Sequence, residues 1–197
     1  MDMPANSGAD FPANTIDRAE NIQVDCYVRS GVPAPVAETI NALTERLQQL
    51  CDHGPISDFQ VSQWPSEHHG VTKTDEMRPT RDELVAEFEQ WAEQHDYTLE
   101  PAFRRDEVPS SPLGLGSNET HERVRVPFIA VALYEADTET GLDTEALRGV
   151  VPYTEGSDTV EDRTYTVQEW LSALETKECE KSPYSQHDQA AALEGRP

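Results

Sequence analysis

The run VPFIAVALY at residues 126–134 constrains the fold more than any other part of this sequence. Successive side chains of a β-strand point to opposite faces of the sheet, and every residue of this run is apolar or aromatic. Both faces of such a strand must be buried, because exposing either would leave a large apolar area in water. The run therefore predicts a central strand that helices cover on one face and a second layer or a partner covers on the other.

Shorter patterns predict the elements around this strand. Apolar and polar residues alternate over residues 21–29, which is typical of a strand with one buried face. Apolar residues at helical spacing over 36–50 predict an amphipathic helix. The remaining predicted elements are strands at 56–64, 97–103 and 147–153 and helices that begin at the capping boxes Thr80-x-x-Glu83 and Thr166-x-x-Glu169. This order predicts an α/β fold, a two-layer sandwich with a mixed, largely antiparallel sheet and a ferredoxin-like βαβ start.

Charge is the strongest feature of the composition. The chain has 38 Asp and Glu against 15 Lys and Arg, a formal net charge of -23, and only 3 lysines. The carboxylates are spread along the whole chain, whereas an acidic segment that mimics nucleic acid or binds basic partners would concentrate them. An evenly acidic surface favours a halophilic protein, because in molar salt the Debye length falls to about 3 Å and self-repulsion is screened.

The two ends of the chain differ from its middle. Residues 1–20 and 178–197 contain only three residues of the Leu, Ile, Val and Phe set, so we expect two disordered tails around a single α/β domain at 21–177. No apolar stretch approaches the roughly 18 residues of a membrane span, and no signal peptide pattern begins the chain. The three cysteines lack C-x-x-C spacing and fit reduced thiols. We therefore expect a cytoplasmic protein with no membrane partner.

Four arginines form the main candidate site. Arg104 and Arg105 end the strand predicted at 97–103, and Arg123 and Arg125 precede the central strand. If these segments are antiparallel neighbours across the 110–122 loop, their guanidinium groups gather at one end of the sheet and can bind phosphate or carboxylate. The alternative is that nearby carboxylates neutralise them in salt bridges; these are Asp106, Glu107, Glu119 and Glu122.

A second candidate is an interface residue. Trp64 closes the predicted strand at 56–64 out of phase with Phe59 and Val61, which predicts that it faces away from the core toward a groove or an oligomer contact. The central sheet or an edge strand could also pair with a second copy of the chain. A homodimer or a protein partner is therefore open.

The sequence contains few signals of metal binding or catalysis. Cys51, His53, His68 and His69 could supply metal ligands, but their spacing matches no recognised site, so no metal and no cofactor is predicted. No G-x-S-x-G elbow and no glycine-rich phosphate loop occurs, so no catalytic residue is predicted. Cys26 lies among apolar neighbours, where a thiol is usually inert packing.

Several segments resemble a group of small acidic haloarchaeal proteins of unknown function, some of which carry the label "HTH domain protein". The segments are YVRS at 27–30, ISDFQV at 56–61, FEQWA at 88–92 with LEPAF at 99–103, and VALYE at 131–135. The likeness spans about residues 21–175. It implies a protein of salt-rich habitats, and the label implies binding to DNA. It transfers no catalytic residue.

These observations leave three hypotheses open. The favoured one is a non-enzymatic binding or regulatory module of the halophilic cytosol. The first alternative is a small enzyme or ligand-binding domain with an anion site lined by the four arginines. The second alternative is a DNA-binding regulator, as the family label implies; the sequence does not favour nucleic acid as a partner, because no predicted helix is basic enough for recognition.

Overall fold

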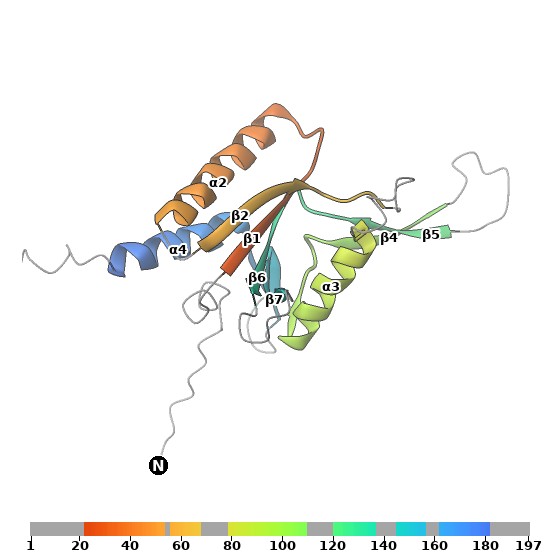
Figure 1. Cartoon of the computed structure of the whole chain (residues 1–197). Coiled ribbons are helices and arrows are strands. Elements are labelled where there is room, and N and C mark those ends of the chain that lie inside the picture. The colour runs from red at the N-terminus through yellow and green to blue at the C-terminus, as the bar shows by residue number, and fades with distance from the viewer. Residues whose placement is uncertain are drawn as a thin grey trace, which may run out of the picture.

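The computed structural model describes residues 22–53, 56–67, 79–109, 120–136, 145–156 and 162–181. Within these ranges the chain forms three helices and nine strands (Figure 1). In chain order they are β1 (Ile22–Val28), α2 (Ala34–His53), β2 (Ile56–Gln63), α3 (Arg81–Gln94), β3 (Tyr97–Thr98), β4 (Arg104–Pro109), β5 (Thr120–Arg125), β6 (Ile129–Ala136), β7 (Glu145–Val151), β8 (Tyr153–Glu155), β9 (Arg163–Tyr165) and α4 (Val167–Lys181).

A four-stranded sheet in the order β2-β1-β6-β7 forms the centre of the molecule. β1 and β2 are parallel and α2 connects them, whereas β6 is antiparallel to both β1 and β7. Val24 in β1 is the register partner of Phe59 on one side and of Leu133 on the other. The mixed sheet with a βαβ start is therefore confirmed. Two smaller antiparallel sheets, β3-β8-β9 and β4-β5, flank it.

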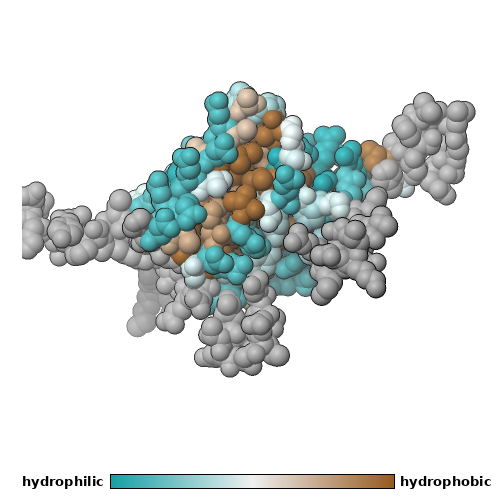
Figure 2. Space-filling view, turned by 45° about the horizontal axis from the view of Figure 1, so that its top comes forward, coloured by the Kyte–Doolittle hydropathy of each residue, from teal (hydrophilic) through white to brown (hydrophobic). Residues whose placement is uncertain are grey.

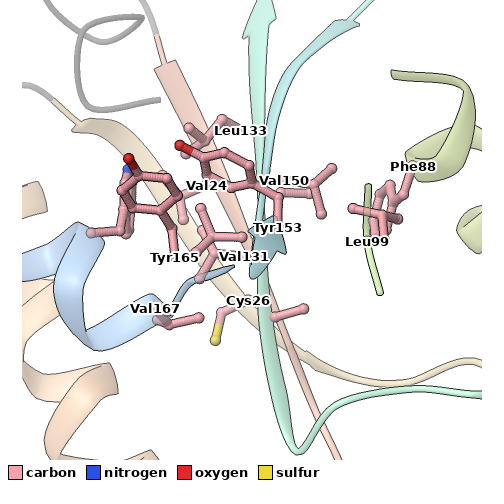
Figure 3. Close-up of a cluster of buried hydrophobic side chains, with 14 of the residues drawn as sticks. Val24, Cys26, Phe88, Leu99, Val131, Leu133, Val150, Tyr153, Tyr165 and Val167 are labelled. Carbon is pink, nitrogen blue, oxygen red and sulfur yellow. The ribbon is translucent and has the colours of Figure 1, made fainter. Parts of the chain in front are cut away.

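Both faces of the sheet are covered. Residues 130–134 of β6 are all buried, so a central strand with two covered faces is confirmed there. The strand begins at Ile129 and not at Val126 as predicted, and Phe128, which precedes it, is exposed. Figure 1 shows α2 and α4 on one face, and α3 extends the sandwich over the other. In Figure 3, Val24, Cys26 and Val167 lie on the α4 side of the strands, and Phe88 of α3 lies on the other side of the sheet. The core is thus divided between two faces of one sheet.

Hydrogen bonds fix the start of two helices as the sequence predicts. At α3, the Glu83 N–H donates to Thr80 Oγ1 (3.3 Å), and the Thr80 N–H donates to the Glu83 carboxylate (2.7 Å). Thr166 and Glu169 repeat this exchange at α4, with distances of 3.3 and 2.9 Å. Each box satisfies backbone donors that have no partner inside the helix. α4 is also tied to α2, because Arg46 donates two hydrogen bonds to Glu175 (2.7 and 2.8 Å).

Prolines divide two strands that the sequence predicts as continuous. The segment predicted at 97–103 forms only β3, and Arg104 begins β4 after Pro101. The segment predicted at 147–153 divides at Pro152 into β7 and β8. Proline lacks the N–H that a ladder needs, so strands break there. α4 continues to Lys181, four residues past the expected domain boundary, and the rest of the predicted tails lies outside the described residues.

Candidate functional site

Strands β4 and β5 form a two-stranded antiparallel ribbon that carries the four candidate arginines. The register places Arg104 opposite Arg125 and Arg105 opposite Val124. Because cross-strand partners share a face and side chains alternate along each strand, Arg104, Arg123 and Arg125 lie on one face of the ribbon and Arg105 on the other. Figure 1 shows the ribbon extending away from the four-stranded sheet, beyond α3. The structure thus brings three of the four arginines together.

The fourth arginine holds the ribbon to the body of the protein. Arg105 donates two hydrogen bonds to Glu89 of α3, at 2.6 and 3.0 Å, and it also lies 3.4 Å from Glu122. The hydrogen bonds to Glu89 raise the pKa of the Arg105 guanidinium above its ordinary value. Val124 is buried on the same face. This face of the ribbon is therefore structural, and Arg105 is one of its attachments.

The ion pairs on the other face of the ribbon, which carries Arg104, Arg123 and Arg125, are exposed to solvent. Arg125 contacts Asp106 at 2.5 Å with 70% of its side chain exposed, and Arg123 contacts Glu67 at 3.0 Å with 55% exposed. Arg104 is exposed and makes no salt bridge within the part of the chain that the structure describes. Exposed pairs of this kind contribute about 0 to 1 kcal/mol and are screened by salt. These guanidinium groups can therefore exchange their present partners for another anion at small cost.

The carboxylates expected to neutralise the arginines do so only in part. Asp106 pairs with Arg125 and Glu122 with Arg105, Glu107 makes no salt bridge within the described residues, and Glu119 lies outside them. A hollow of about 250 Å³ lies beside Arg104 and Arg105, but Glu89, Glu93 and Glu100 also line it. Three carboxylates against two guanidinium groups give this hollow no net attraction for a small anion.

Trp64 is a core residue, so the prediction that it faces outward is wrong. The residue is 8% exposed, and its Nε1–H donates to the Pro127 carbonyl at 3.1 Å. Its ring stacks on Tyr27 with centroids 5.2 Å apart and meets Phe103 edge to face at 5.9 Å. As predicted, the side chain of Trp64 lies on the opposite face of the sheet from Phe59. That face is not exposed, however, because Phe103 and the α3 side of the core cover it.

A polar cluster on the α3 side of the sheet was not predicted. The Tyr27 hydroxyl donates to Asp25 at 3.2 Å, and Gln60 of β2 donates to the same carboxylate at 2.7 Å. Burial raises the pKa of Tyr27 and of the neighbouring Tyr134, and it also raises the pKa of Glu87. Neither tyrosine forms a phenolate at neutral pH, so the cluster acts through neutral hydroxyl groups. The only sequence signal is the alternation of Asp25 and Tyr27 with the apolar residues of β1.

The cysteine and histidine side chains do not form a metal centre in the described part of the chain. No group of three or more His, Cys, Asp or Glu side chains is placed to hold an ion there. His68 and His69 lie outside the described residues. Cys26 is fully buried, and burial raises the pKa of its thiol to about 12. It is therefore a packed thiol, as its apolar neighbours predict.

Fold and site together define a small α/β protein with an arginine-bearing β-ribbon. A family model described as a helix-turn-helix domain matches residues 16–179, which is most of the chain, so this protein belongs to that helix-turn-helix domain family. The likeness to proteins labelled as HTH domain proteins is thereby confirmed. No curated protein and no solved structure gives a significant match.

The described helices do not pair as a helix-turn-helix. A strand and residues 68–78 separate α2 from α3, and seven strands separate α3 from α4, whereas the motif joins two helices by a turn of about three or four residues. Within the described ranges, no helix is long and apolar enough to cross a membrane.

Proposed function

We propose that this protein is a DNA-binding regulatory module whose contact with DNA is made by the β4–β5 ribbon. The observation that carries the proposal is the grouping of Arg104, Arg123 and Arg125 on one exposed face of that ribbon. Membership of a helix-turn-helix domain family supports DNA as the partner. A two-stranded β-ribbon fits the major groove of B-DNA as an α-helix does, and several DNA-binding proteins use one.

The charge of the other elements supports this choice of contact element. α3 carries five carboxylates and one arginine, and α2 carries three carboxylates and one arginine. α4 carries four carboxylates and two lysines. By contrast, β4 and β5 together carry four arginines and three carboxylates. An acidic helix repels the phosphate backbone, so none of these helices suits the role of a recognition helix.

The ion pairs on the ribbon are compatible with this role. Arg123 and Arg125 are mostly exposed, so phosphate oxygens can replace Glu67 and Asp106 as their partners. Guanidinium groups bind phosphate and the guanine edge with two parallel hydrogen bonds. High salt, which we infer to be the working condition from the net charge of -23, screens the repulsion between the acidic body and DNA and also weakens the contacts between arginine and phosphate, so the affinity should depend on both.

The test is duplex binding by fluorescence anisotropy as a function of KCl, over the range in which circular dichroism shows an intact fold. The ribbon variant combines Arg104→Gln, Arg123→Gln and Arg125→Gln. A matched control removes the same charge from three exposed arginines elsewhere on the described surface; these are Arg29, Arg148 and Arg163. A randomised pool of duplexes serves as the probe, because the sequence of the target is open.

We expect the ribbon variant to bind more weakly and with a shallower salt dependence. The slope of log K against log salt should fall by about 0.9 for each phosphate that the variant no longer neutralises. The control should keep the slope of the native protein. Equal weakening of both variants would mean that net charge alone decides binding. That outcome, or the absence of binding by the native protein to any duplex of the pool, would overturn the proposal.

A further inference from the structure

β2 is an edge strand of the central sheet. β2 pairs with β1 along one side of its backbone. Along the other side, no strand of the described chain pairs with it. The Phe59 N–H donates to the adjacent Asp58 carboxylate at 2.8 Å. This bond indicates that Phe59, and Val61 two residues later, direct their backbone groups away from β1. Backbone groups that face away from the sheet are a template for another strand, and in a dimer the Phe59 N–H would exchange its present bond to Asp58 for one to the partner strand.

From Asp58 to Gln63 the edge lacks the features that usually prevent pairing. Natural edge strands are commonly protected by lysine, proline or a bulge. β2 has the sequence ISDFQVSQ, with Asp58 as its one charged residue and no lysine or proline. The register with β1 shifts at Ser57, where β2 has one extra residue, and is unbroken from Asp58 to Gln63. Charged residues make up 27% of the whole chain, so β2, with one charged residue in eight, is less charged than the chain as a whole.

Apolar surface accompanies the open edge. Val61 is 45% exposed and Phe59 is partly buried. Their register partners in β1 are Cys26 and Val24, so both side chains lie on the α2 face of the sheet. Figure 2 shows apolar residues gathered in a strip that follows α2 and β2, bordered by hydrophilic residues. A contiguous exposed apolar surface of this kind is typical of a protein interface.

We propose that two copies of this chain associate through β2, antiparallel and around a two-fold axis, so that their central sheets join into one sheet of eight strands. A two-fold interface uses the same surface on both copies, and an antiparallel edge strand satisfies this requirement with its own backbone. Each copy carries a net charge of -23, so two copies repel least where the surface is neutral. β2 is such a surface, which favours a second copy as its occupant.

The side chains of β2 select a register. When Gln60 lies opposite the partner's Gln60 on the axis, Phe59 lies opposite the partner's Val61 and Asp58 opposite the partner's Ser62. Each exposed valine is then covered by an aromatic ring, and no two carboxylates face each other. The backbone groups of Phe59 and Val61 form the hydrogen-bonded pairs, which leaves Gln60 at a non-hydrogen-bonded pair with its Cα atoms about 4.5 Å apart.

The oligomeric state is measured by sedimentation equilibrium of the full chain in molar KCl. We expect a dimer whose dissociation constant falls as KCl rises, because salt screens the repulsion between the copies. Val61→Lys places a charge on the edge and should weaken dimerisation at least tenfold. Phe128→Lys is the matched control, since Phe128 is 46% exposed but lies outside β2, and it should leave the dissociation constant unchanged.

A cysteine at the axis tests the register independently of the charge variant. In a background of Cys51→Ser and Cys179→Ser, Gln60→Cys should form an intermolecular disulfide on mild oxidation, because the expected Cα separation suits one. Asp58→Cys should not, since it lies opposite the partner's Ser62. A native protein that sediments as a monomer at all concentrations would overturn the proposal. So would a dimer that Val61→Lys and Phe128→Lys weaken equally, or a dimer in which Gln60→Cys and Asp58→Cys form disulfides equally well.

Discussion

Replacing Trp64 by alanine should destabilise the monomer strongly, because the indole ring is part of the core. The ring contacts Tyr27 and Phe103 at centroid distances of 5.2 and 5.9 Å, and each such aromatic pair contributes about 0.5 to 1.5 kcal/mol beyond burial. The hydrogen bond to the Pro127 carbonyl adds about 1 kcal/mol. Since the substitution also removes the buried apolar area of the ring, Trp64→Ala should lower the free energy of unfolding by about 3 to 5 kcal/mol.

The measurement is urea denaturation at constant molar KCl, followed by circular dichroism. Trp64→Phe keeps an aromatic ring but removes the donor to Pro127, so we expect a smaller loss of about 1 to 2 kcal/mol. Phe128→Ala serves as a comparison at an exposed aromatic residue and should have a clearly smaller effect than Trp64→Ala. An interface tryptophan on a monomer surface would change stability by only about 0.5 kcal/mol. A loss below about 1 kcal/mol for Trp64→Ala would therefore refute the core assignment.

Four further predictions concern the salt dependence of the fold, two individual residues and the two ends of the chain. Far-ultraviolet circular dichroism in a KCl titration should show the fold in molar salt and its loss below roughly a few tenths molar, since dilution restores the self-repulsion of the acidic surface; an unchanged helical signal at low salt would contradict this. Cys26 should fail to react with a thiol reagent at pH 8 until urea unfolds the chain, because its pKa is about 12, and rapid reaction in the native state would contradict the burial. Glu169 has a pKa below its ordinary value because it accepts the backbone and side-chain hydrogen bonds of the helix cap, so its stabilisation is present above about pH 4.5 and is lost as the pH falls through the folded pKa; Glu169→Gln should reduce the acid-dependent fall of the urea midpoint, and an unaltered pH profile would exclude this role. Deleting residues 1–20 and 182–197 should leave the melting temperature within about two degrees, since these segments contain few large apolar residues, and a large drop would show that one of them packs on the domain.

The ribbon shows where prediction from the sequence stops. The sequence identifies Arg104, Arg105, Arg123 and Arg125 as a basic group, because four of the 12 arginines flank one loop. Whether they share a face depends on the register of two strands, and a shift of one residue would exchange the faces. The register observed separates Arg105 from the other three and places it against Glu89, which lies on a helix that precedes the ribbon in the chain.

Periodicity and local hydrogen-bonding chemistry determined much of this protein without reference to tertiary structure. The apolar run at 126–134 predicted a strand with two covered faces, which the structure has from residue 129 onward, and each capping box fixed a helix start, because both depend on residues close together in the chain. Trp64 shows what only the tertiary structure decided. Its phase along the strand is local, but its burial depends on Phe103 and α3, which are distant in sequence. The same holds for the open edge of β2, because the order of strands in a sheet is set by packing between distant segments.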